Sequence, residues 1–129
     1  MRRSTRPNVE QVLLHGTTAR RALTIVTNQQ FSPGDPLYVV FRSNRDLAEV
    51  FACRKAKRES DQPSVLTIVI EEADFLTIRA RGDAKLIPFD AEDAHYLRSR
   101  NQWVISPAGV QLLNKFLISV DSESIPMRM

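Results

Sequence analysis

The chain has 129 residues, of which 43% are hydrophobic and 26% are charged. Such a composition is typical of soluble globular proteins, and the length favours one domain with one core over two. The 18 basic and 15 acidic residues give a net charge of +3. A single cysteine, Cys53, excludes an internal disulfide and a cysteine-based zinc site.

The chain begins with a basic segment, Met1 to Asn8, and no apolar segment typical of a signal peptide or membrane span follows it. We expect residues 1–8 to form a basic flexible tail, residues 9–121 a single domain and residues 122–129 a C-terminal tail. The expected location is the cytoplasm. The sequence leaves open whether the protein acts in its own cell or as a delivered effector.

The first predicted unit is a strand followed directly by a helix. Residues 11–14 form a short apolar run that stops at His15 and Gly16, which is typical of a buried strand ending in a tight turn. Thr17 or Thr18 can cap the helix that follows. The helical spacing then predicts one buried stripe, made of Ala19, Ala22, Leu23 and Val26, with Arg20 and Arg21 exposed.

A loop rich in Pro and Gly over residues 31–36 leads into a β-prone run over residues 37–41. Ser43 or Asn44 can cap a second helix, whose last turn holds the basic cluster Arg54 to Arg58, as the helix dipole favours. Further strands are predicted over residues 65–70, 75–79, 85–89, 102–106 and 115–120, and a short helix over residues 90–100. This order predicts an α+β fold rather than an alternating parallel sheet.

Three blocks of the sequence resemble the ADP-ribosyltransferase family with a His-Tyr-Glu signature, which includes diphtheria toxin and the poly(ADP-ribose) polymerases. They are Leu14 to Thr18, Leu37 to Ser43 and Asn101 to Val110. The resemblance implies a split antiparallel β-sheet core with two or three flanking helices. It also implies that NAD is bound as a substrate.

By this resemblance, the backbone of Gly16, with the adjacent Thr17, holds the nicotinamide carboxamide, and His15 holds the adenosine-side ribose. Tyr38 stacks on the nicotinamide ring, with Phe51 as a second wall, and Ser43 adds a hydroxyl contact. A glycine permits close approach of a ligand to the main chain, and flat aromatic faces favour stacking. Without the family context, His15 and Tyr38 would be interpreted as core residues, and Ser43 as a helix cap.

Gln102 stands where the family has its catalytic glutamate, so Gln102 and Tyr38 are the candidate catalytic residues. An amide keeps the hydrogen bond of the glutamate but loses its charge, which costs roughly a hundred- to a thousandfold in rate. The resemblance therefore implies a weakly active mono-ADP-ribosyltransferase or NAD glycohydrolase. An alternative is a catalytically degenerate module of the same fold that binds a protein or an ADP-ribose-like ligand.

A third alternative, a small RNA-binding or RNA-modifying domain, rests only on the basic N-terminal segment. Asp90, Glu92, Asp93 and His95 are explained by the start of the predicted helix, so we expect no metal site. The acceptor of a transferred ADP-ribosyl group is expected to be a protein more often than a nucleic acid. No membrane partner is expected.

Overall fold

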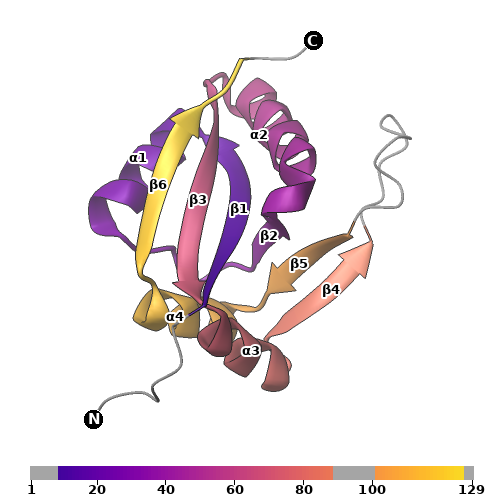
Figure 1. The fold of residues 1–129 in the computed structure, drawn as a ribbon. Coiled ribbons are helices and arrows are strands. Elements are labelled where there is room, and N and C mark those ends of the chain that lie inside the picture. Colours follow the sequence, from indigo (N-terminus) through magenta and orange to yellow (C-terminus); the bar gives the residue numbers. More distant parts are fainter. Residues whose placement is uncertain (1–8, 89–100, 127–129) are drawn as a thin grey trace.

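The computed structural model describes residues 9–88 and 101–126. These residues form a six-stranded antiparallel sheet and four α-helices, so the fold is α+β (Figure 1). The strands are β1 (Glu10–Thr18), β2 (Leu37–Phe41), β3 (Pro63–Glu71), β4 (Ala84–Pro88), β5 (Asn101–Ile105) and β6 (Ser119–Ser124). The helices are α1 (Ala19–Asn28), α2 (Arg45–Glu59), α3 (Glu72–Ala80) and α4 (Pro107–Phe116), and a short 3-10 turn, η1 (Arg42–Asn44), precedes α2.

The strands lie in the order β4-β5-β2-β1-β3-β6, and the sheet is divided in its middle. On one side β1 pairs with β3 along its whole length, from Glu10 to Thr18. On the other side it pairs with β2 only at Leu13 and Leu14. The β1-β3-β6 half and the β4-β5-β2 half therefore separate beyond Leu14, and Figure 1 shows β4 and β5 turned away from the other strands.

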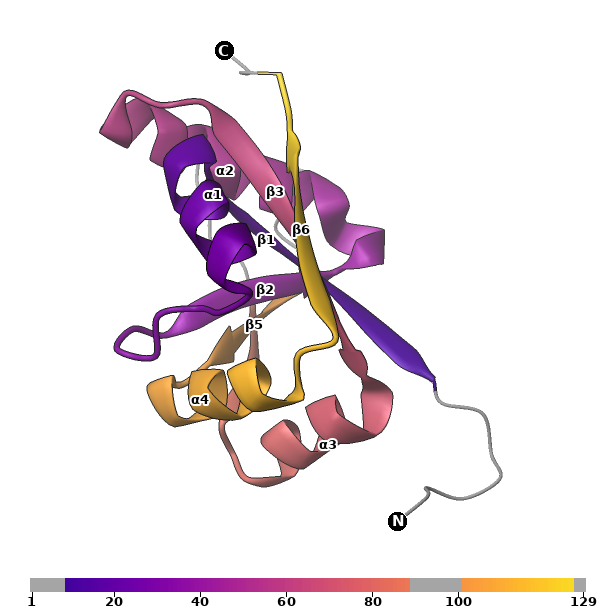
Figure 2. The same ribbon diagram turned by 90° about the vertical axis from the view of Figure 1, so that its left-hand side faces the viewer.

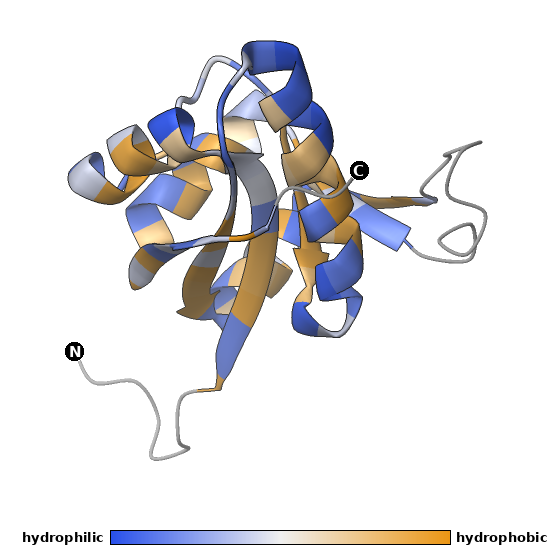
Figure 3. Ribbon diagram, turned by 90° about the horizontal axis from the view of Figure 1, so that it is seen from above, coloured by the Kyte–Doolittle hydropathy of each residue, from blue (hydrophilic) through white to orange (hydrophobic). Residues whose placement is uncertain are grey.

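Helices α1 and α2 cover opposite faces of the β1-β3-β6 half, whereas α3 and α4 lie together at the end where the chain enters β1 (Figures 1 and 2). Successive residues of β1 enter different cores, because side chains alternate across a strand. Leu13 joins the core that packs with Phe75 and Leu113. Leu14 joins the core under α2, with Val40. In Figure 3 the strands are largely hydrophobic and the outer side of α2 is hydrophilic.

The structure confirms the predicted strand over residues 37–41 and those near 65–70, 85–89 and 102–106, and the helix after each of the first two strands. The first strand does not stop at His15 and Gly16, however. It continues to Thr18, because each residue up to Thr18 pairs with β3. Thr18 is the cap of α1, and its hydroxyl accepts a hydrogen bond from the backbone of Arg21.

Three other predictions about the elements are wrong. Leu23 of α1 is 68% exposed, so it is not part of the buried stripe. The segment 75–79 lies in helix α3, where Phe75 and Ile78 are buried one helical turn apart and acidic residues occupy the first turn. The segment 115–120 is divided between the end of α4 and the start of β6. Ser106 caps α4, accepting from the backbone of Gly109, and Pro107 begins it.

The ends of the expected domain also differ from the observed ones. Strand β6 runs to Ser124, and Ile125 is buried beyond it, so the ordered domain extends past the predicted boundary at residue 121. The predicted helix over residues 90–100 and the basic tail over residues 1–8 lie outside the described residues. Among the helices of the described part, none is long and apolar enough to cross a membrane.

Candidate functional site

Two neighbouring clefts lie where β1 and β2 separate. The smaller one, of about 280 Å³, lies between α2 and three strands, which contribute His15 and Gly16 (β1), Tyr38 (β2) and Gln102 (β5). The larger one, of about 630 Å³, lies between α1, β1 and the loop over residues 30–36. His15, Tyr38 and Lys55 line both clefts. These three residues therefore mark the junction of the two spaces.

His15 is buried and bridges the two halves of the sheet. Its Nδ1 lies 2.6 Å from the backbone carbonyl oxygen of Tyr38, and since a carbonyl only accepts, Nδ1 carries the hydrogen. Burial, and then the charges of Lys55 and Arg21, lower the pKa of His15 to about 4. The imidazole is therefore neutral at pH 7, and its Nε2 has a free lone pair that can accept a hydrogen bond.

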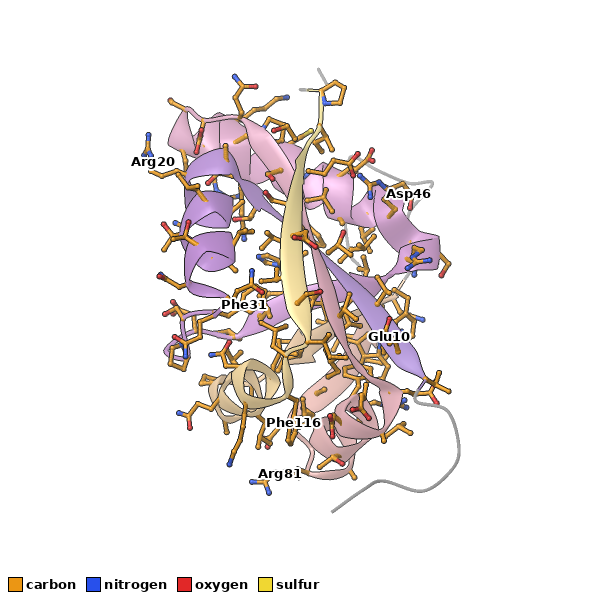
Figure 4. The ribbon with its side chains drawn as sticks, turned by 60° about the vertical axis from the view of Figure 1, so that its left-hand side comes forward. Glu10, Arg20, Phe31, Asp46, Arg81 and Phe116 are labelled. Atoms are coloured by element: carbon orange, nitrogen blue, oxygen red, sulfur yellow. The ribbon has the colours of Figure 1, made fainter. Side chains whose placement is uncertain are left out.

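The ring of Phe31 packs against the ring of His15. The two rings meet edge to face, with centroids 6.3 Å apart, and Phe31 points inward from the start of the loop after α1 (Figure 4). The amide and carbonyl of Phe31 are both bound by the side chain of Asn114, at 2.7 and 2.8 Å. The orientation of His15 is thus fixed by a hydrogen bond and by a well-anchored aromatic neighbour.

Gly16 is required by the packing of helix α2 on β1. A Cβ atom at this position would lie 2.0 Å from the carbonyl oxygen of Ala48 and 2.7 Å from the amide nitrogen of Ala52. These are backbone atoms, which cannot move aside as a flexible side chain can. The main chain of Gly16 lines the smaller cleft, but the absence of its side chain is explained by α2 and not by a ligand.

Two aromatic residues stand on different walls of the smaller cleft. Tyr38 is 43% exposed, because side chains alternate across a strand and its neighbours Leu37 and Val39 face the core. Phe51 lies on α2, where it is half-buried and also packs against the core beneath that helix. A flat ring at the mouth and a second one on the opposite wall suit a planar ligand group.

Gln102 is the buried polar side chain of this cleft. It is only 7% exposed, and its Oε1 has no hydrogen-bond partner among the described residues. Its neighbour Trp103 faces the other way and packs on Phe75, with ring centroids 5.4 Å apart. A buried amide oxygen without a partner costs free energy, about 1–3 kcal/mol. A ligand that donates a hydrogen bond to Gln102 would recover that cost.

Three basic side chains line the smaller cleft. Arg54, Lys55 and Arg58 of α2 line it, and no acidic side chain does so within the described residues. Lys55 is half-buried, and its pKa is lowered by that burial and then by Arg21. The nearest acid, Glu59, is held by Arg21 at 2.9 Å. Lys55 therefore has no ion-pair partner in the part of the chain that the structure describes.

Of the predicted site residues, His15, Gly16, Tyr38, Phe51 and Gln102 come together at the smaller cleft. Thr17 is buried on the wall of the larger one. Ser43 lies in η1 and lines neither cleft. The sequence reasoning missed Phe31 and Lys55, although Lys55 belongs to the basic cluster that was attributed to the helix end.

Among the described residues no group of three or more His, Cys, Asp or Glu side chains could hold a metal ion. Searches against protein-family models, curated protein sequences and solved structures found no match.

Proposed function

We propose that the two clefts bind NAD and that the protein is a mono-ADP-ribosyltransferase or NAD glycohydrolase with an ADP-ribosyltransferase-like fold. One observation carries the proposal. The pair His15 and Gly16 is far in the sequence from Tyr38 and from Gln102, but all four residues line one cleft at the split of the sheet. These are the positions at which the sequence resembles the family, and a chance resemblance gives no reason for them to converge.

The larger cleft has the size of a small-molecule site and suits the ADP part of NAD. Neutral His15 supplies Nε2 as an acceptor for a ribose hydroxyl, which needs no charge neutralisation. Lys55, at the junction of the two clefts, is placed to bind the diphosphate that joins the two nucleosides. A lysine ammonium recognises phosphate as a point charge.

The smaller cleft would take the nicotinamide riboside. Tyr38 and Phe51 offer ring faces for the nicotinamide, and the main chain of Gly16 borders the same space. The Oε1 of Gln102 accepts a hydrogen bond from the hydroxyl of the ribose. As the glycosidic bond breaks, its electron pair leaves with nicotinamide, and an acceptor or water attacks the anomeric carbon.

Gln102 and the basic residues also favour a second candidate, a catalytically degenerate module that binds an ADP-ribose-like ligand. The positive charges of Arg54, Lys55 and Arg58 oppose the positive ring of NAD and the cation that forms during cleavage, and within the described part of the chain the cleft is lined by no carboxylate. ADP-ribose carries the same diphosphate without the positive ring. This candidate predicts tighter binding of ADP-ribose than of NAD.

Calorimetry with NAD and with ADP-ribose, together with chromatographic detection of released nicotinamide, separates the two candidates. Release that exceeds the spontaneous rate and is lost in a Tyr38→Ala variant would support the enzyme. Binding of ADP-ribose without release would support the degenerate module. If neither ligand binds, both candidates fail.

A further inference from the structure

Basic residues gather around the two clefts. The first turn of α1 and the last turns of α2 bring together six basic residues: Arg20, Arg21, Arg54, Lys55, Lys57 and Arg58. The acidic residues beside them are Asp35, Glu59 and Asp61. The other 24 charged residues are twelve basic and twelve acidic. With six basic and three acidic residues this group, which we call the basic end, has a local charge of +3.

The geometry supports treating these residues as one surface. Arg21 and Lys55 both lower the pKa of His15, and Arg58, Lys55 and Arg21 all act on Glu59. Arg20, Lys57 and Arg58 are exposed, and Figure 4 shows Arg20 pointing outward from the start of α1. Charges this close add their fields at the cleft mouth, where they attract a polyanion.

Exposed apolar side chains are scarce at the same place. The large exposed hydrophobic residues of the described chain are Val9, Leu23, Tyr38, Leu76, Leu86 and Ile118, and only Tyr38 lines a cleft. Stable protein partners bury apolar anchors in the centre of their interface. A basic rim around one exposed aromatic ring is instead typical of surfaces that bind single-stranded nucleic acids, in which bases stack on aromatic side chains.

We propose that the basic end binds a single-stranded nucleic acid, with its phosphates along Arg54, Lys57 and Arg58 and one unstacked base at Tyr38. A duplex cannot place a base on Tyr38 unless a nucleotide leaves the stack, so single strands are preferred. The inference goes beyond the proposed function, because binding requires no NAD. Because the proposed function also places the nicotinamide ring at Tyr38, the strand and NAD compete for that side chain.

The test is fluorescence anisotropy without NAD, using labelled 15-nucleotide single-stranded RNA and DNA and the corresponding duplex. A Lys57→Glu, Arg58→Glu double variant should weaken single-strand binding at least tenfold. The matched control is Lys85→Glu, Lys115→Glu, which changes the net charge equally at exposed positions away from the clefts and should bind within about twofold of the parent. The affinity should fall with salt, with a logarithmic slope of about −2 for three phosphate contacts.

A Tyr38→Ala variant should bind single strands with an affinity that is lower by about fivefold or more, because its base-stacking contact is removed. Replacing Arg2, Arg3 and Arg6 with Ser tests whether the N-terminal segment is responsible, and it should leave the affinity within about threefold. Comparing the affinities for the RNA and the DNA strand shows which of the two nucleic acids is preferred. No binding at low salt, equal loss in both double variants, or duplex bound as tightly as single strands would each overturn the proposal. Because NAD is absent, failure here leaves the proposed function unaffected.

Discussion

The imidazole of His15 donates from Nδ1 to the backbone carbonyl oxygen of Tyr38 across the split of the sheet, over 2.6 Å. The two strands are no longer paired at this point, because their register ends at Leu14 and Val40. A side chain thus replaces the missing strand hydrogen bond. The ring keeps the clefts at a fixed width and presents Nε2 as an acceptor.

This relationship predicts how the stability of the fold depends on pH. The pKa of His15 is lowered from 6.5 to about 4, so between these values the unfolded chain binds a proton that the folded chain does not. The stability that the neutral ring contributes is fully present above about pH 6.5 and is lost as the pH falls to about 4. The loss reaches about 3 kcal/mol at most, at 1.36 kcal/mol per pKa unit.

Urea denaturation at pH 7.0 and pH 5.0 measures this effect, and a His15→Asn variant is the control. Asparagine can donate to the carbonyl of Tyr38 from nearly the same position but does not titrate. Its free energy of unfolding should fall less between the two pH values than that of the parent. Equal losses in the two proteins would show that His15 titrates normally.

Gly16→Ala should be strongly destabilising. The new methyl group would meet backbone atoms of Ala48 and Ala52 at 2.0 and 2.7 Å, so α2 must move away from β1. We expect a loss of about 3 kcal/mol or more in the free energy of unfolding, beyond the usual range for overpacking. Chemical denaturation followed by circular dichroism provides the measurement.

The control for this variant is Gly34→Ala, in the loop before β2. No atom lies within 4 Å of a Cβ atom built at Gly34, and its φ is not in the left-handed region. Its stability should stay within about 0.5 kcal/mol of the parent or rise slightly, because alanine restricts the unfolded chain. A Gly16→Ala protein as stable as this control would contradict the close packing of α2.

The elements that the sequence predicted correctly are those with strong local signals. The run over residues 37–41 is apolar and β-prone, and α2 has acids early and bases late. The two errors at α3 and β6 came from short apolar stretches, whose helical or strand character depends on their tertiary neighbours. Phe75, for example, is β-prone by type, but it is held in a helix by packing against Phe41 and Trp103.

The sequence predicted most of the residues that line the candidate site, but it did not predict the positive charge of the cleft. The family resemblance links His15, Gly16 and Tyr38 to Gln102, although the strand end predicted at His15 and Gly16 is wrong. The position of Lys55 at the junction of the clefts could not be derived, since the basic cluster of α2 has a sufficient local explanation in the helix dipole. Which member of such a cluster faces a cleft depends on how the helix is rotated against the sheet.

Gln102→Glu should convert the smaller cleft to one that stabilises positive charge. Arg54, Lys55 and Arg58 line the same space, so the new carboxylate has compensating cations and the variant should remain folded. If the site binds NAD as proposed, nicotinamide release should rise about a hundredfold, the effect of one well-placed electrostatic group. A chromatographic assay of NAD turnover measures it.

The matched control makes the same chemical change on an exposed surface. Gln111 is exposed on α4 and lines neither cleft, so Gln111→Glu should leave turnover unchanged. An increase in both variants would point to a general effect of charge on the protein. No increase in Gln102→Glu, with NAD still bound, would remove Gln102 from the reaction centre.

Lys55→Met tests the binding role of Lys55 separately from its effect on the fold. We expect the variant to be more stable than the parent but to bind the ligands more weakly. The ammonium of Lys55 is half-buried without an ion-pair partner among the described residues, and burial and Arg21 lower its pKa. Removing it should therefore raise the melting temperature.

The affinity for NAD and ADP-ribose should fall by about tenfold or more, because a hydrogen bond to a charged group contributes about 1.5–3 kcal/mol. Lys57→Met, at an exposed position two residues further along α2, is the control and should change ADP-ribose affinity less than threefold. Calorimetry and thermal denaturation of the three proteins measure both effects. A Lys55→Met protein that is more stable but binds ADP-ribose as tightly as the parent would show that the diphosphate lies elsewhere.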